Sequence, residues 1–201
     1  GKEIDFFMSR DIINCMTVNY ILHHDSFDAA LGCQDNCIRM MHGSDLMMEI
    51  ACEAPVTAIL AVRELTLSKQ PPLVFYGMDN GELRCLKFPT NKMNRNGVRS
   101  SPLGDEAEYT ELWVLGDGDK KSPIVNICFS DLTRSGTECI MVGREDGRVE
   151  VFYVVDCDEC TERFCNHRKV PTLAFSYDLG EKIQSICIGK VNSTIHNEIV
   201  V

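Results

Sequence analysis

A short motif that recurs along the chain constrains its fold more than any other feature. The motif opens at Gly32, Gly77 and Gly143, and alternating apolar residues follow it. Its turn pairs are Asp35-Asn36, Asn80-Gly81 and Asp146-Gly147. Asn and Gly tolerate the positive φ angles of a two-residue hairpin turn, and the alternation is that of a half-buried strand. Each copy therefore predicts two antiparallel strands joined by a tight turn.

Further apolar strands flank these hairpins. The segments that precede them are 18–22, 56–60, 124–128 and 183–187, and those that follow are 46–51, 109–115 and 172–177. Four strands in the order strand, hairpin, strand are typical of a β-propeller blade. The predicted fold class is therefore all-β, a partial β-propeller of four-stranded antiparallel blades. A β-sandwich is the alternative, although its strands need not resemble one another as these hairpins do.

The spacing of the motif predicts the domain organisation. The opening glycines at 32, 77 and 143 recur after 45 and 66 residues, whereas a blade takes roughly 40 to 50. Insertions near 89–105 and 156–168 account for the excess, since neither has apolar periodicity. We expect residues 1–201 to be part of one propeller domain, with roughly three full blades and partial blades at both ends.

The expected partial blades lead to a prediction about the chain by itself. Residues 4–7 read as the outer strand of a preceding blade, and the chain ends at Val201, before a fourth turn glycine. Open blade faces would be apolar and exposed. We therefore expect the isolated chain to pair with a second copy or a partner, or to aggregate.

Composition narrows the function classes. The formal net charge of -10 opposes binding to nucleic acid. No run approaches the roughly 18 apolar residues of a membrane span, and the first residues lack a signal-peptide pattern. The 11 cysteines are odd in number, and several lie in apolar strand-like runs, which indicates free thiols and a reducing, cytoplasmic compartment.

One cluster has the residue types of a zinc site. Cys157 and Cys160 are followed by Cys165 and His167, which could supply four tetrahedral ligands. The second pair follows the first more closely than in closed zinc sites. We expect a solvated insertion with no metal and no other cofactor, and we keep these four residues as zinc candidates.

Other motifs favour a structural reading. The stretch 131–136 has too few oxygen ligands for calcium. A hydrolytic triad is not expected from four residues that are neighbours in sequence, because they cannot normally face one another, so a polar turn is predicted at His23, His24, Asp25 and Ser26. No catalytic motif is found, and no enzyme is predicted. The residues expected to matter structurally are the turn glycines Gly32, Gly77, Gly81, Gly143 and Gly147.

Three segments also carry a family resemblance. They are 33–39 with 43–45, then 142–151, and finally 198–201, in that order along the chain. With them the chain resembles the β-propeller family of the seventh Bardet-Biedl syndrome protein, a subunit of the ciliary coat complex called the BBSome. The resemblance carries no catalytic residue.

The resemblance implies a function and partners. It implies a non-enzymatic scaffold subunit of the BBSome that helps to move membrane proteins to and from cilia. Its partners would be other BBSome subunits, notably the second and ninth Bardet-Biedl proteins, and indirectly ciliary membrane-protein cargo. Its location would be the cytoplasm, the cilium and the ciliary base or basal body. A generic peptide-binding signalling propeller and a zinc-stabilised interaction module remain as alternatives.

Overall fold

The computed structural model describes residues 7–23, 25–63, 71–89, 109–116, 122–134, 136–155, 170–192 and 197–201. These residues form fourteen strands and no helix. The strands of the first sheet are β1 (Ile13–Asn19), β2 (Asp28–Cys33), β3 (Cys37–His42) and β4 (Asp45–Ala51). Those of the second are β5 (Val56–Val62), β6 (Leu73–Met78), β7 (Leu83–Lys87) and β8 (Thr110–Leu115).

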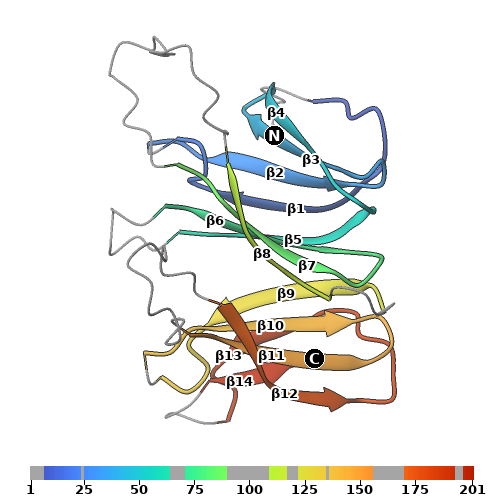
Figure 1. Ribbon diagram of the computed structural model, residues 1–201, viewed down its shortest axis with the longest axis vertical. Helices are drawn as coiled ribbons and strands as arrows, with labels where there is room; N and C mark the ends of the chain where they lie inside the picture. The colour runs from blue at the N-terminus through green and yellow to red at the C-terminus, as the bar shows by residue number, and fades with distance from the viewer. Residues whose placement is uncertain are drawn as a thin grey trace, which may run out of the picture. The chain divides into compact units, whose positions relative to one another are not determined.

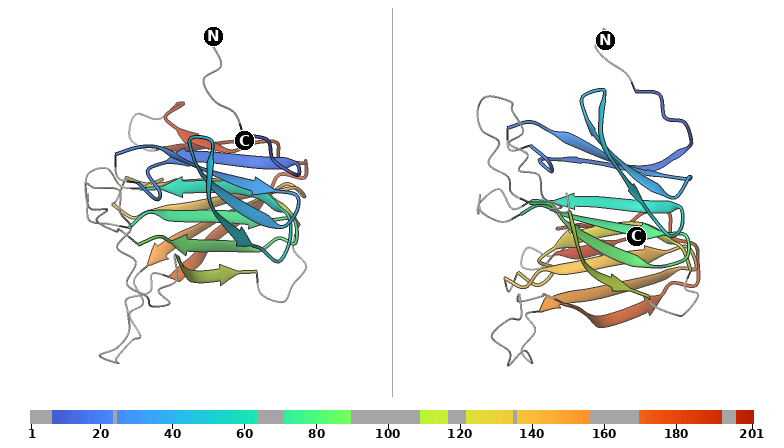
Figure 2. Two further views of the ribbon diagram at one scale, coloured as in Figure 1. Left: turned by 90° about the horizontal axis from the view of Figure 1, so that it is seen from above. Right: turned by 45° about the horizontal axis from the view of Figure 1, so that its top comes forward.

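The remaining strands form two more sheets. The third sheet holds β9 (Ile124–Ser130), β10 (Cys139–Arg144), β11 (Arg148–Val155) and β12 (Val170–Asp178). The fourth pairs β13 (Cys187–Gly189) with β14 (Glu198–Val200). Figure 1 labels the strands, and Figure 2 shows that each four-stranded sheet is twisted.

Within each four-stranded sheet, neighbouring strands are also consecutive in sequence. Such a meander is the topology of a propeller blade, whereas a Greek-key sandwich brings non-consecutive strands together. The predicted fold class, all-β with four-stranded antiparallel blades, is therefore confirmed.

The chain divides into two compact units. The first comprises 1–76 and 84–112, and the second comprises 77–83 and 113–201. Each unit has its own buried side chains. The first buries Ile38, Met40, Val56, Phe75 and Phe88, and the second buries Ile124, Ile140, Met141, Val151 and Ile183. Full burial of one such side chain stabilises a fold by roughly 1.5–3 kcal/mol.

Burial follows the position of a strand in its sheet. All six residues of β10 are buried, as are five of the six in β6, because these strands lie inside their sheets. The edge strands β1 and β4 consist mainly of exposed and partly buried residues, and Ile50 is the one buried residue of β4.

Two predicted strands were placed wrongly. The segment 18–22 was expected to be a strand, but β1 ends at Asn19, because the Asp28 carboxylate accepts the N–H groups of Ile21 and Leu22 at 3.2 and 2.6 Å and so removes them from a sheet ladder. The segment 183–187 was also expected to be a strand, but β13 begins only at Cys187. Ile183 and Ile186 are buried against Val149 without extending a ladder. Residues 4–6 of the expected first strand lie outside the described residues.

Candidate functional site

The three hairpin turns share one backbone conformation. The fourth residue after each opening glycine has a positive φ: 59° at Asn36, 85° at Gly81 and 96° at Gly147. In the third turn the N–H of Gly147 donates to the carbonyl of Arg144 at 3.1 Å. The first residue of each pair, Asp35, Asn80 or Asp146, does not have a positive φ, so the expected turn with positive φ at both residues was wrong. The motif still corresponds to one recurring turn geometry.

The opening glycines share a different feature, a close approach of a side chain from the next blade. A Cβ at Gly32 would lie 2.6 Å from Val56, one at Gly77 2.4 Å from Ile124, and one at Gly143 2.5 Å from Ile186. Real Cβ atoms are not found at such distances from other carbon atoms. A side chain at these positions would therefore displace the apolar residue that packs on the sheet there, which is Val56, Ile124 or Ile186. We interpret each glycine as a point of close packing within its own compact unit.

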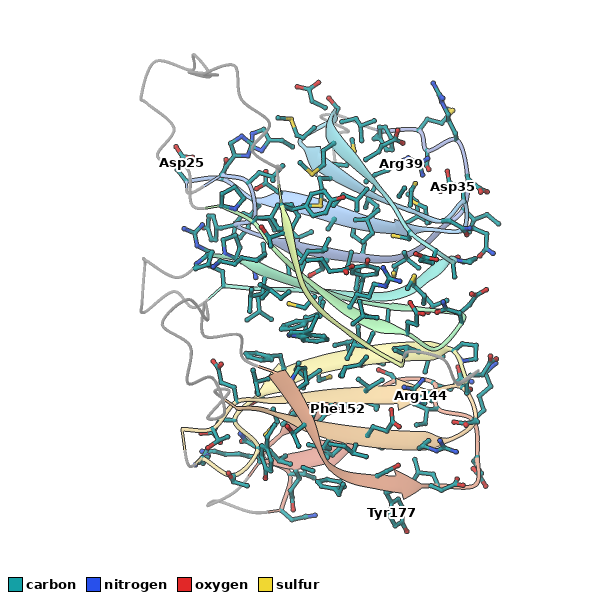
Figure 3. The ribbon with its side chains drawn as sticks, in the orientation of Figure 1. Asp25, Asp35, Arg39, Arg144, Phe152 and Tyr177 are labelled. Atoms are coloured by element: carbon teal, nitrogen blue, oxygen red, sulfur yellow. The ribbon has the colours of Figure 1, made fainter. Side chains whose placement is uncertain are left out.

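Charged groups beside the turns are paired with one another. Seven residues after the opening glycines lie Arg39, Arg84 and Glu150, at equivalent positions of the three motifs. Arg39 Nε donates a hydrogen bond to the Glu49 carboxylate at 2.8 Å, and Arg84 Nη1 donates one to the Glu111 carboxylate at 3.2 Å. Figure 3 shows Arg39 beside Asp35, its second carboxylate partner. These arginines neutralise carboxylates of their own sheet.

In the third motif a carboxylate, Glu150, stands where the first two motifs have an arginine, and its partner Arg144 directly follows the opening glycine. Glu150 accepts a hydrogen bond from Arg144 Nε at 2.7 Å, and their side chains are only 5% and 3% exposed. Arg144 Nη1 also donates to the carbonyls of Gly81 at 3.0 Å and Ser122 at 2.8 Å. This buried, fully hydrogen-bonded pair ties three segments of the second unit together, which is a structural task.

The most concentrated polar cluster lies in the first unit. Nδ1 of His23 is 2.6 Å and Nδ1 of His42 is 2.9 Å from the same oxygen, Asp28 Oδ1. The other oxygen, Oδ2, accepts the N–H groups of Ile21, Leu22 and His23, the last at 3.0 Å. The Asp28 side chain is fully buried, and the two imidazole rings lie 4.1 Å apart.

The electrostatics of the cluster follow from these contacts. Burial alone would raise the pKa of Asp28, but hydrogen bonds from the rings of His23 and His42 and from backbone amides outweigh it, so the pKa lies below its ordinary value. Asp28 is thus an ionised carboxylate that accepts five hydrogen bonds. A carboxylate can only accept, so each ring must carry its hydrogen on Nδ1.

The sequence pattern pointed to His23 but not to Asp28 or His42. The pairing of Asp28 with His42 could nevertheless have been deduced from the strand register. The predicted hairpin around Asn36 pairs Gly32 with Ile38 and Ala29 with Met41, and the same register continued by one step places Asp28 opposite His42. The expected polar turn at 23–26 does lie between β1 and β2, with His24 outside the described residues.

The other candidates have different outcomes. The zinc candidates Cys157, Cys160, Cys165 and His167 lie outside the described residues, as do the insertion near 156–168 and, apart from Pro89, the insertion near 89–105. In the stretch 131–136, the Asp131 carboxylate accepts the N–H of Gly136 at 2.6 Å and so closes its own loop.

The cysteines of the described segments are free thiols. Burial raises the pKa of Cys85 to about 12 and that of Cys52 to about 11, so both are protonated and unreactive at neutral pH. Within these segments no helix has the length and apolar character of a membrane span.

Comparison with known proteins identifies the family. The family model described as the BBS7 beta-propeller matches residues 1–201. The chain belongs to the BBS7 β-propeller family. The mouse (Mus musculus) protein "BBSome complex member BBS7" is 27% identical over 202 residues, which cover 99% of this chain and 24% of that protein. The chain thus spans about a quarter of the length of this relative. The resemblance to the propeller of the seventh Bardet-Biedl syndrome protein, inferred from the sequence, is confirmed.

Solved structures of a protein named BBS1N also match this chain. Two crystal structures of BBS1N in complex with ARL6DN, soaked with lead or mercury, are 13% and 14% identical. They align over 89% and 90% of this chain and 59% of theirs, with TM-scores of 0.37 and 0.39.

Proposed function

We propose that this chain is part of a non-enzymatic scaffold subunit of the BBSome, acting in the trafficking of membrane proteins to and from cilia. The observation that carries the proposal is the match of the BBS7 propeller family to residues 1–201. The relative that aligns with 99% of this chain at 27% identity is itself described as a BBSome complex member.

The chemistry of the described side chains supports a scaffold. The arginines beside the turns are satisfied by carboxylates and backbone carbonyls within the described residues. In the described segments the His23–Asp28–His42 cluster contacts no hydroxyl or thiol nucleophile, and acid–base chemistry alone needs a substrate group in reach. Rigid sheets with internally neutralised charges suit the presentation of edges and loops to neighbouring proteins.

The proposal includes the organisation of the chain and its location. Residues 1–201 would be part of one propeller domain, with roughly three full blades and partial blades at both ends. The full protein would contact other BBSome subunits, including the second and ninth Bardet-Biedl proteins, and reach ciliary cargo through them. It would reside in the cytoplasm, the cilium and the ciliary base.

Affinity purification of the tagged full-length protein from ciliated cells tests this proposal. We expect quantitative mass spectrometry to recover BBSome subunits, the second and ninth Bardet-Biedl proteins among them, well above an unrelated tagged propeller. Recovery of an unrelated set of peptide-motif proteins would instead support a signalling propeller.

A further inference from the structure

The His23–Asp28–His42 cluster contains more than the fold requires. Oδ2 of Asp28 closes the β1–β2 connection by accepting three backbone N–H groups, which a carboxylate can do without any histidine. The two imidazoles bind the other oxygen, and among the described residues no hydrogen bond to either Nε2 atom is found. Two rings that converge on one buried carboxylate oxygen therefore need a reason beyond turn closure.

The residue types and distances are those of a transition-metal site. One ligand atom from each of His23, Asp28 and His42 lies within 4.8 Å of the others. Two imidazole nitrogens and one carboxylate oxygen are a common three-residue ligand set for zinc, with a water in the fourth position. Calcium and magnesium are disfavoured, because they prefer a shell of oxygen ligands and only one carboxylate is present.

Exposure and charge fit an ion that enters from solvent. The Asp28 side chain is fully buried, while the side chains of His23 and His42 are 13% and 37% exposed. The carboxylate thus lies at the base of the cluster and His42 at its solvent side. The cluster carries one negative charge when both imidazoles are neutral, and the whole chain carries a formal charge of -10.

The geometry requires only a small adjustment to admit an ion. Tetrahedral ligands with metal–ligand bonds of about 2.0–2.2 Å lie roughly 3.3–3.5 Å apart. The two nitrogen–oxygen distances are 2.6 and 2.9 Å, which are hydrogen-bond lengths. Rings that retreat by under about 1 Å would let an ion replace the two bridging hydrogens. Each neutral imidazole then moves its proton through water from Nδ1 to Nε2, so no net proton is released.

We propose that His23, Asp28 and His42 bind one divalent transition-metal ion of the zinc class, with the fourth coordination position open to water. The ion would join the β1–β2 connection to the end of β3 and so stabilise the first sheet. This inference goes beyond the proposed scaffold function and does not depend on it.

Metal binding can be measured with Zn²⁺ alone and with Co²⁺ as a spectroscopic substitute. Because Cys157, Cys160 and Cys165 could compete, the chain should carry Ser at these three positions in every sample. We expect one equivalent of Zn²⁺ to bind at pH 7.5, to raise the melting temperature, and to be weakened at pH 5, since imidazole ligands must be unprotonated. Co²⁺ should give visible d–d bands without a thiolate charge-transfer band, which reports nitrogen and oxygen ligands.

Variants assign the ion to the site. His42→Gln, at the exposed side of the cluster, should weaken Zn²⁺ binding at least tenfold and abolish the metal-dependent rise in melting temperature. Asp25→Asn, which removes an exposed carboxylate outside the cluster, should change neither, and it serves as the matched control (Figure 3).

A second variant and a spectrum separate the loss of a metal ligand from a loss of stability. If His42→Gln melts lower than the parent chain without metal, His23→Gln and the Co²⁺ spectrum of the parent chain decide the question. Absence of stoichiometric binding in the parent, or equal binding in the parent and both His variants, would show a hydrogen-bonded cluster only and overturn the proposal.

Discussion

Replacement of Gly147 by Ala tests the turn geometry of the third motif, because two separate costs meet at this residue. Its φ of 96° is a conformation that costs an L-residue about 1–2 kcal/mol. An added Cβ would also lie 2.5 Å from the backbone oxygen of Glu181, and a backbone atom cannot move aside as a flexible side chain can. Overpacking of this kind costs typically about 1–3 kcal/mol. We therefore expect Gly147→Ala to destabilise the chain by about 2–5 kcal/mol.

Gly136→Ala provides the matched control. Gly136 has a φ of 83°, yet a Cβ there would meet no heavy atom within 4 Å. This variant should therefore show only the conformational cost of about 1–2 kcal/mol. The difference between the two variants isolates the contact with Glu181.

Urea unfolding measures this difference. The single tryptophan, Trp113, belongs to the same compact unit as Gly147 and reports its unfolding by fluorescence. With a slope of about 2 kcal/mol per molar urea, the midpoint of Gly147→Ala should lie about 0.5–1.5 M below that of Gly136→Ala. Equal midpoints for the two variants would refute the close approach to Glu181, and two unchanged midpoints would refute the turn geometry itself.

Three further predictions concern other parts of the chain. Glu150→Gln should cost about 3 kcal/mol or more, because it leaves Arg144 buried without its carboxylate, whereas Glu49→Gln, at a side chain that is 52% exposed, should cost under about 1 kcal/mol in the same denaturation assay. Asp28→Asn should lower the melting temperature at pH 7. Because the pKa of Asp28 lies below its ordinary 3.8, the stability that its ionised form contributes is fully present above pH 3.8 and is lost as the pH falls through the folded-state pKa. The difference in melting temperature between the variant and the wild type should therefore disappear in strong acid. The 201-residue chain should self-associate through exposed apolar residues such as Phe175 and Tyr177 on β12, the latter labelled in Figure 3, and replacement of both by Ser should reduce the association. Light scattering from the unsubstituted chain that shows only a monomer would refute this prediction.

Local sequence patterns predicted the strands that flank the three hairpin turns, because the turn residues and the alternation of apolar residues are both local. The turn pairs ending at Asn36, Gly81 and Gly147 have a strong local preference for positive φ, and the strands on both sides follow at once. The error at 18–22 arose because a side chain ten residues away from Val18, Asp28, claims the amides of Ile21 and Leu22. Apolar residues in a loop and in a strand look alike in sequence when both are buried.

The polar cluster was harder to predict than the strands. His23 and His42 are nineteen residues apart, and only the register of β2 and β3 brings His42 beside Asp28. The register follows from the turn at Asn36, so one half of the cluster could have been deduced. The position of His23 depends on the path of the β1–β2 connection, which the Asp28 carboxylate itself sets, and no periodic pattern encodes that path.

The membership of this propeller in a BBSome scaffold is tested most directly by its recovery with the complex. Tagged full-length protein from ciliated cells should be compared with Gly136→Val and Gly147→Val versions, with the ratio of co-purified BBSome subunits to bait as the readout. We predict a near-stoichiometric ratio for the wild type, a small decrease for Gly136→Val, which bears only the conformational cost, and the largest decrease for Gly147→Val, which also meets Glu181. A wild-type protein that recovers no BBSome subunit above the unrelated propeller control would contradict the account.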